Sequence, residues 1–208
     1  MVRIKSKKAR RGMVGIEAAI VLIAFVIVAA ALAFVVLNMG FFTTQKSKEA
    51  IGSGLQEATS ALEVDGAVIG KTDSGKLAAV AIPLKCSTGK NPIDLTKTVI
   101  KIRTPTDTVV LVVNQTDPSA NIITGNDKPF DDLGTRRFAF IRYQGDTDML
   151  LEVNEKWVLV INMASVLGSG LDAYTTFMVE IKPPTGAPLT VERTVPPNLS
   201  DTIIVLES

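Results

Sequence analysis

The feature that most constrains this chain is an unbroken run of twenty apolar residues near its N-terminus, residues 18–37. The run contains only Ala, Val, Ile, Leu and Phe, and an α-helix of that length spans about 30 Å, the hydrocarbon thickness of a bilayer. A buried core helix is the alternative interpretation, but a chain of 208 residues has too little core to surround it on all sides. We therefore expect the segment to enter a membrane, at least for a time.

Charge is concentrated just before this run. Six of the 22 basic residues lie in the first eleven positions, and no acidic residue accompanies them. Basic residues on this side of an apolar segment favour a cytoplasmic N-terminus by the positive-inside rule. Without the first twelve residues the chain has 16 basic and 21 acidic groups, a net charge of −5. The cluster is therefore local, and we expect no nucleic-acid partner.

Three outcomes for the apolar segment remain open from the residues alone. It can be a permanent anchor, or a secretory signal that is cut after the Ala31-Leu32-Ala33 sequence. It can also stay on the mature protein after a cut that precedes it. The segment is long for a cleaved signal, and a helical pattern continues beyond it, which favours retention.

That helical pattern extends well past the apolar run. Ile51, Leu55, Ala58 and Leu62 recur at helical spacing and form one stripe of an amphipathic helix. We expect a single helix over residues 13–65, followed by a linker over residues 66–75. A helix of this kind is roughly 78 Å long. It needs an apolar environment, which lipid provides before assembly and a bundle of like helices provides afterwards.

From about residue 76 the pattern changes to short runs of Val, Ile, Thr and aromatic residues, separated by Gly, Pro, Asn and Asp. Strands without intervening helices predict a β-sandwich over residues 76–208, and thus an α+β fold for the whole chain. The runs at 109–113 and 158–161 are apolar throughout, as expected of strands buried on both faces. The predicted strands cover residues 76–86, 96–104, 108–114, 138–143, 157–164, 175–182, 189–194 and 202–206.

The residue inventory argues against catalysis. The chain has no His, which removes the commonest general base, and its single cysteine, Cys86, allows no intrachain disulfide and no thiol metal site. We therefore expect no enzyme activity and no cofactor. Asp146, Asp148 and Glu152 follow a Gly and are weak candidates for a calcium site; a solvated turn is the alternative interpretation.

Two asparagines match the N-glycosylation sequon. Asn114 begins Asn-Gln-Thr, and Asn198 begins Asn-Leu-Ser. Both lie at predicted strand ends or turns, where an acceptor is exposed. Chains of this size often contain one or two such matches by chance, so the motif alone has low specificity.

The start of the chain resembles a known family. Residues 10–17, Arg-Arg-Gly-Met-Val-Gly-Ile-Glu, with the apolar run after them, are similar to the leader and mature start of type IV pilin-like proteins with a class III leader peptide. The longer stretch as far as Phe42 resembles archaellins, the archaeal flagellins, and residues 180–184 and 196–199 are similar to archaellin ends. Bacterial pilins commonly carry a helix-bending Pro and a C-terminal disulfide loop. This chain has neither, which favours an archaellin.

The resemblance implies how the chain is processed and assembled. A prepilin-type leader peptidase would remove residues 1–12 by cutting between Gly12 and Met13, which makes Glu17 the fifth mature residue. The new Met13 ammonium and Glu17 of neighbouring subunits would then form an assembly pair. The alternative for Glu17 is a first-turn acid that only favours the positive end of the helix. The resemblance also implies an immunoglobulin-like sandwich as the outer shell of a filament, with glycans on Asn114 and Asn198.

The sequence and the resemblance together predict a structural subunit of the archaeal motility filament, the archaellum. The precursor would lie in the cytoplasmic membrane, and the mature chain would form an extracellular helical homopolymer. Its partners would be its own copies, the leader peptidase and a membrane assembly and motor platform. One alternative is an adhesive type IV pilus-like fibre. Another is a monomeric membrane-anchored β-domain that binds a ligand or polymer at the cell surface.

Overall fold

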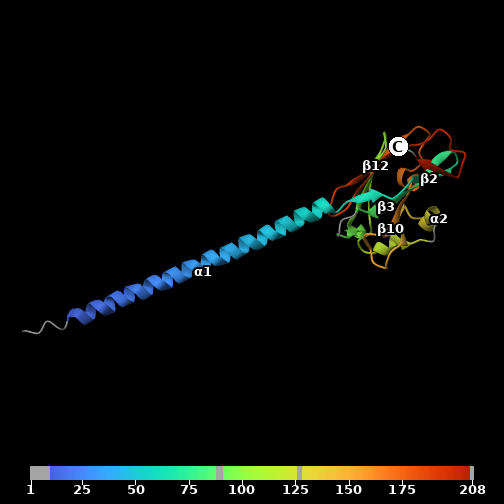
Figure 1. The fold of residues 1–208 in the computed structure, drawn as a ribbon. Coiled ribbons are helices and arrows are strands. Elements are labelled where there is room, and N and C mark those ends of the chain that lie inside the picture. The colour runs from blue at the N-terminus through green and yellow to red at the C-terminus, as the bar shows by residue number, and fades with distance from the viewer. Residues whose placement is uncertain (1–9, 88–90, 126–127, 207–208) are drawn as a thin grey trace, which may run out of the picture. The chain divides into compact units, whose positions relative to one another are not determined.

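One helix, α1, forms the N-terminal part of the chain and runs from Arg10 to Thr59 (Figure 1). The structure is a computed structural model that describes residues 10–87, 91–125 and 128–206, with the backbone alone for residues 10–14. The predicted leader therefore lies mostly outside the described residues. At 50 residues the helix is about 75 Å long. Ala, Leu, Ile and Val dominate its sequence and no Pro interrupts it, so the prediction of a long N-terminal helix is confirmed.

The end of α1 corrects the predicted boundary at residue 65. The helix stops at Thr59, and Leu62–Val64 forms the short strand β1. β1 pairs antiparallel with residues 84–86 of the following sheet, which satisfies its backbone groups. Leu62, which continues the apolar stripe of the helix in the sequence, is instead only 4% exposed and packs in the core of the sandwich. Tertiary packing overrides the helical periodicity here.

The linker predicted over residues 66–75 is also wrong. Its residues form strand β2, Val68–Asp73, which makes a hairpin with β3, Lys76–Cys86. The hairpin turn is Ser74-Gly75, and both residues have positive φ, +53° and +74°. Two residues of positive φ match the right-handed twist of the flanking strands. The chain divides into two units, Met1–Ser53 and Gly54–Ser208, so the second unit includes the last turns of α1.

The larger sheet of the second unit has seven strands in the order β13-β2-β3-β10-β8-β7, with β1 also paired to β3. All its pairs are antiparallel except β7 with β8, which is parallel. The strands not yet given are β7 (Ile122–Thr124), β8 (Phe138–Gln144), β10 (Lys156–Asn162) and β13 (Ile203–Leu206).

The smaller sheet has four antiparallel strands in the order β12-β11-β5-β6. They are β5 (Val99–Arg103), β6 (Thr108–Val112), β11 (Thr176–Lys182) and β12 (Leu189–Thr194). A further two-stranded ribbon joins β4 (Ile93–Asp94) to β9 (Leu150–Leu151). All eight predicted strands are present in the two main sheets, which confirms the antiparallel β-sandwich.

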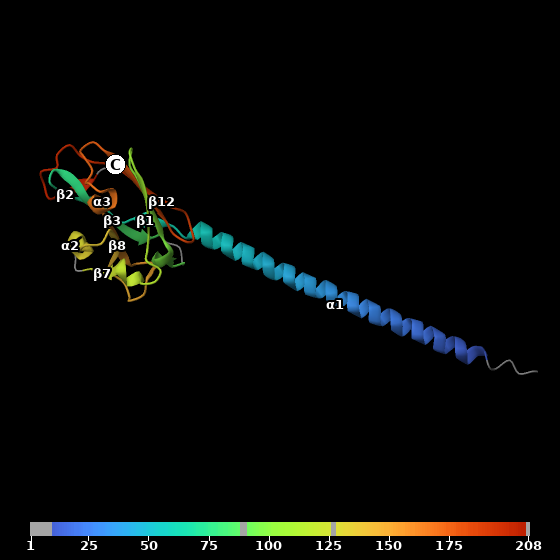
Figure 2. The same ribbon diagram turned by 180° about the vertical axis from the view of Figure 1, so that it is seen from behind.

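Short helices lie between some strands, contrary to the expectation of strands alone. α2 (Pro129–Leu133) and α3 (Met163–Leu167) both contact the larger sheet (Figure 2), and the 3-10 turns η1 (Leu95–Lys97) and η2 (Pro118–Ala120) sit in loops. α2 starts at a Pro, a residue preorganised for the first helical position. Each helix has only five residues, too short for the apolar period to reveal it.

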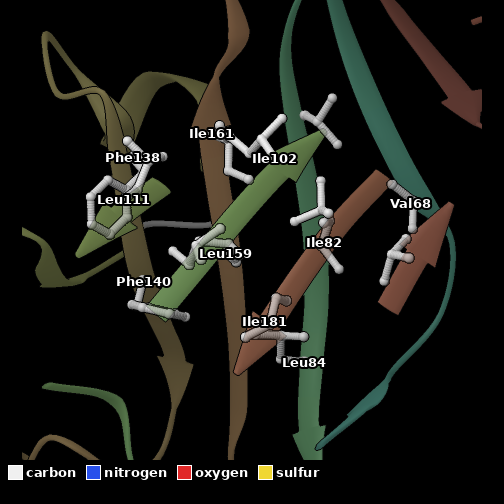
Figure 3. Close-up of a cluster of buried hydrophobic side chains, with 14 of the residues drawn as sticks. Val68, Ile82, Leu84, Ile102, Leu111, Phe138, Phe140, Leu159, Ile161 and Ile181 are labelled. Atoms are coloured by element: carbon white, nitrogen blue, oxygen red, sulfur yellow. The ribbon is translucent and has the colours of Figure 1, made fainter. Parts of the chain in front are cut away.

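The main core lies between the two sheets (Figure 3), and strands contribute to it by alternation. In β11, Phe177, Val179 and Ile181 are fully buried, while the residues between them are half-buried. Trp157, Phe140 and Phe177 are the largest fully buried side chains. Burial of such a side chain stabilises the fold by roughly 1.5–3 kcal/mol. This core belongs to the sandwich, so the second unit is held together by its own residues.

The outer face of the larger sheet carries a second buried cluster, made by Ala81, Ala139, Ile141, Val160 and Leu133 of α2. β10 therefore has apolar neighbours on both faces, which confirms the prediction for residues 158–161. The same prediction is wrong for residues 109–113. Leu111 is buried there, but its neighbours in β6 on either side are more than half exposed.

Candidate functional site

The candidate site is the surface of α1 itself. From Ile16 to Phe42, every large apolar side chain is more than half exposed. Within the described residues, α1 from Gly15 to Thr59 is the single helix long and apolar enough to cross a membrane, and none of its most apolar stretch is buried. Each such side chain gains about 1.5–3 kcal/mol on full burial. The helix therefore requires lipid or other protein around it.

The end of the apolar region keeps its polar groups bonded within the helix. The hydroxyls of Thr43 and Thr44 donate to the carbonyls of Met39 and Gly40, four residues earlier, at 2.8 Å. These bonds let the helix pass from an apolar to a polar surface without a break. An i−4 hydroxyl bond of this kind leaves the side chain satisfied in an apolar medium.

The last third of α1 carries charged side chains beside the apolar stripe. Lys46 forms an ion pair with Glu49 at 2.6 Å, and its ammonium lies 5.9 Å from the centre of the Phe42 ring. The side chains of Ile51 and Leu55 are 71% and 63% exposed. Exposed ion pairs of this type contribute about 0–1 kcal/mol. The apolar stripe, and not the charge pair, is the feature of this segment that calls for a partner.

Glu17 is the first acidic residue of the described helix, and it is exposed. Its carboxylate has no hydrogen bond or ion pair to any side chain that the structure describes. Gly12 and Met13 belong to α1, and the structure describes only their backbone. The predicted pair of Met13 with Glu17 is therefore not tested. Met13 and Glu17 are four residues apart, which places them one turn apart on the same face.

Both predicted glycan acceptors lie in exposed coil. Asn114 lies two residues after the end of β6, and its side-chain oxygen accepts the backbone N–H groups of Thr116 (2.9 Å) and Asp117 (3.3 Å). The oxygen of Asn198 accepts both the N–H (3.1 Å) and the hydroxyl (2.8 Å) of Ser200. Both sequons thus form Asx turns that leave the amide nitrogen toward solvent. Their occupancy stays a prediction.

The three acids weighed as calcium ligands are spread along a loop that is held by other bonds. The carboxylate of Asp146 accepts the N–H of Asp148, and that of Asp148 accepts the N–H of Leu150, at 3.0 and 2.9 Å. Glu152 contributes its own N–H to another carboxylate. No group of three or more His, Cys, Asp or Glu in the described ranges is placed to hold a metal ion.

The carboxylate that organises this loop is Glu155, which the sequence reasoning missed. It is only 8% exposed and accepts three bonds, from the N–H of Asp146 (3.0 Å), the N–H of Glu152 (3.1 Å) and the indole N–H of Trp157 (3.1 Å). Gly145 lies against it with φ of +145°, and a Cβ there would meet a Glu155 oxygen at 2.3 Å. The signal in the sequence was a Glu two residues before a Trp, because a buried Trp needs a hydrogen-bond acceptor for its indole N–H.

The geometry of a bare helix followed by a sandwich agrees with the comparisons to known proteins. A family model described as archaeal-type flagellin matches residues 12–193. The chain belongs to the archaeal-type flagellin family. The predicted resemblance to archaellins is therefore confirmed, and the family match begins at Gly12, the residue before the predicted cut.

Relatives within this family cover almost the whole chain. A protein named "Probable flagellin 1" of Aeropyrum pernix is 48% identical over 200 residues, which cover 91% of this chain and 94% of that protein. The "Probable flagellin 2" of Archaeoglobus fulgidus is 37% identical and covers 98% of this chain and 100% of that protein.

Solved structures of the family share the architecture. The archaeal flagellum of Methanospirillum hungatei strain JF1 matches with a TM-score of 0.67 and 30% identity, over 91% of this chain and 98% of that chain. A crystal structure of an archaeal flagellin from Methanocaldococcus jannaschii gives a TM-score of 0.62 at 21% identity, over 71% of this chain and 96% of that chain. The second likeness supports the fold alone. Flagellins of this family are structural filament proteins.

Proposed function

We propose that this chain is the structural subunit of an archaeal motility filament and that it polymerises through α1. The observation that carries the proposal is the helix surface over residues 18–37, which is apolar on all sides and is not covered by any other residue that the structure describes. A helical bundle of identical copies covers such a surface completely. The match to the Methanospirillum hungatei flagellum over 91% of the chain supports the same arrangement.

Before assembly, lipid covers α1. The residues of α1 from Gly15 onward are long and apolar enough to span a bilayer, and the basic residues that precede them keep the N-terminus on the cytoplasmic side. Because lipid and a helix bundle are both apolar, the exchange gains little from the hydrophobic effect. Close packing and polar pairing supply the difference, and the many Ala residues of α1 favour close approach.

Processing precedes assembly. A prepilin-type leader peptidase cuts between Gly12 and Met13 and leaves α1 on the mature chain. A membrane assembly and motor platform then moves subunits from the membrane into an extracellular filament and turns it. The basic leader, the Gly at the cut and the family match from residue 12 support this order of events.

The cut also creates a positive charge that can pair with the carboxylate of Glu17. The carboxylate of Glu17 has no partner in the described single chain, and the new Met13 ammonium of a neighbouring copy provides one. Inside an apolar bundle a lone carboxylate is costly, and the pairing offsets that cost and sets the register of neighbouring helices. Glycans on Asn114 and Asn198, which both lie in exposed Asx turns, would coat the outside of the filament.

A strain whose only flagellin is this chain tests the proposal. We expect sheared filaments that contain a subunit starting at Met13, that is, the 208-residue chain without its first twelve residues. Intact mass identifies the start, electron microscopy the filament, and tracking of tethered cells its rotation. A product cut after Ala33 loses the polymerising helix and overturns the proposal. Filaments that never rotate but bind surfaces would favour the adhesive fibre, and a monomeric membrane protein would favour the anchored surface domain.

A further inference from the structure

The outer face of the smaller sheet carries an apolar ridge at its edge. Val110 and Val112 of β6 are 55% and 52% exposed, while Leu111 between them is buried. We call Val110 and Val112 the β6 ridge. β6 is the last strand of its sheet and pairs only with β5 among the described strands. Edge strands usually carry charges or bulges that prevent association, whereas this edge exposes two β-branched apolar residues.

The outer face of the larger sheet carries an apolar hollow. It has a volume of about 440 Å³ and is lined by β2, by α2 and by the start of β13. We call it the β13 groove; its lining includes Ile69, Lys71, Lys128, Phe130 and Ile203. Ile203 is 58% exposed, so α2 covers the sheet face only in part.

The ridge and the groove face opposite directions. Leu111 of β6 and Val68 of β2 both point into the core between the sheets, so their neighbours Val110 and Ile69 point outward from opposite sheets. Figure 3 also shows Leu111 and Val68 at opposite ends of that core. A single copy cannot bring its ridge to its own groove. A two-fold dimer cannot bring both pairs together at once either, so a contact of ridge with groove is heterologous and runs from one copy to the next; such a contact builds an open helix when the rotation between copies does not close into a ring.

Charges around the two surfaces are complementary. Lys71 and Lys128 line the groove and form no ion pair with any described residue, and Asp131 leaves the groove one net positive charge. Asp107 and Asp117 lie before and after β6, are exposed, and likewise have no ion pair with a described residue. Opposite potentials on two such surfaces fix the register of a contact more than its strength.

The cations beside the ridge are partly neutralised within the sheet. Lys101 of β5 lies opposite Val110, but Glu180 of β11 lies opposite Lys101 on its other side. Arg103, opposite Thr108, and Lys182, in line with Val112 through Val99, have no ion pair with a described residue. Glu192 of β12 lies in line with Arg103 through Met178. Asp107, Asp117, Glu180 and Glu192 therefore outnumber the three described cations Lys101, Arg103 and Lys182 by one.

We propose that the β6 ridge of one copy seats in the β13 groove of the next copy along the filament. The partner is a second copy of this chain, because a head-to-tail contact that never closes is the kind that a helical homopolymer requires. The inference rests on the proposed function, since it adds a contact between outer domains to the polymerisation through α1. It assigns two edge strands of the sandwich, β6 and β13, to one interface.

Thiol cross-linking of assembled filaments tests this contact. The parent is the full chain with Cys86→Ala, which has no other cysteine. Val112→Cys and Ile203→Cys are introduced separately and together, and intact filaments are treated with a short bis-maleimide. We expect a ladder of dimers, trimers and longer species from the double variant, and single variants that stay monomeric. The matched control joins Ile203→Cys to Val153→Cys, an exposed valine outside the ridge, and should give no ladder.

The outcomes separate this contact from the proposed function. Parent filaments that form without a ladder in the double variant overturn the contact and leave the proposed function standing. Failure of the unaltered chain to form filaments overturns both. Dimers from Val112→Cys alone would show a two-fold contact of ridges and overturn the head-to-tail arrangement, and an equal ladder from the control would do the same.

Charge reversal gives a second measurement that does not need cysteines. Lys71→Glu with Lys128→Glu should lower filament yield several-fold, and adding Asp107→Lys with Asp117→Lys should restore it. Asp148→Lys with Glu152→Lys is the matched control, because these exposed acids are neither in the groove lining nor next to a lining residue in the sequence, and they lie outside β6. Restoration by the control, or none by the ridge variants, would contradict the contact.

Discussion

The two regions of this chain solve the same problem in opposite ways. The sandwich alternates apolar and polar residues, and it buries Trp157, Phe140 and Phe177 against its own strands. α1 is apolar on every side over residues 18–37, and none of that surface is covered by the rest of the chain as far as the structure describes it. Alternation is the mark of an element that finds its partner in the same chain. An all-round apolar helix must find its partner elsewhere.

The difference teaches where a substitution should be felt. A change in the sandwich core should lower the free energy of unfolding of a single copy. A change on α1 should leave that free energy unaltered and act on membrane residence and assembly. The following predictions use this separation, and each pairs a change with a control from the same region.

The largest effect is expected from Val28→Asp. Val28 is 57% exposed in the single chain, so the sandwich should fold as before. An Asp at the centre of an apolar helix costs about 2.5–3.5 kcal/mol on entering a membrane. We expect filaments to fall below detection, with unaltered protease resistance of the sandwich. Val28→Leu should assemble normally. Normal filaments from Val28→Asp would mean that α1 stays in water.

The effect of Glu17→Ala depends on whether the helix start is buried or wet in the filament. The precursor should insert and be cut normally, because neither step needs the carboxylate. Assembly should weaken by about 3–5 kcal/mol if the Met13 ammonium is then buried without a partner, or by about 0–1 kcal/mol if it stays wet. Filament yield measures this, with cleavage checked by mass. Glu49→Ala is the control, since Glu49 pairs with Lys46 at an exposed position. Equal yields from both variants would reduce Glu17 to an ordinary first-turn acid.

The place where α1 meets the sandwich gives the next prediction. Gly186 has a φ of +99°, and a Cβ there would meet the carbonyl oxygen of Ser60 at 2.0 Å. Gly168 has a φ of +80°, but a Cβ there meets nothing within 4 Å. Gly168→Ala should cost only the backbone strain, about 1 kcal/mol. Gly186→Ala should destabilise the sandwich by about 1–3 kcal/mol or more. Denaturant unfolding in detergent measures the stability of both variants. Equal losses of stability would show that the close approach of Gly186 to Ser60 adds nothing to the backbone strain.

The smallest effect concerns Cys86 and pH. Burial, with a smaller contribution from the Glu63 carboxylate, raises the pKa of the Cys86 thiol above its ordinary value of 9.0. The folded chain therefore holds this proton at a pH where the unfolded chain releases it. The contribution to stability is fully present below about pH 9 and is lost as pH rises further. Cys86→Ala should remove this slope, with little other effect. If the stability of Cys86→Ala depends on pH in the same way as that of the unaltered chain, another group causes this dependence.

Much of the fold could be predicted because its patterns are long. The apolar run at residues 18–37 identified the helix, and eight strands followed from short runs of β-branched residues. Where the patterns were short or shared between structures, the prediction was wrong. Leu62 continues a helical stripe and equally fits a strand, and only pairing with β3 decides between them. The apolar run in β6 looked like a strand with two buried faces, yet it lies at an edge.

The site divides in the same way. The bare surface of α1 followed from composition, but the acceptor role of Glu155 did not, because it depends on a Trp and a loop that meet only in the folded chain. The ridge and the groove needed the sheet order, which no local pattern contains. Gly186 also gave no signal, since its requirement comes from Ser60, far away in the sequence.

The internal hydroxyl bonds of Thr43 and Thr44 have a kinetic consequence. Together with the unbroken backbone bonds of α1, they leave the helix backbone and these two hydroxyls with no partner to change when the surroundings change from lipid to protein. Under the proposed function, a subunit held in the bilayer would then already have the helix conformation that it has in the filament. We therefore expect the rate of filament growth to depend on how fast each helix is withdrawn from the bilayer, and not on refolding of α1.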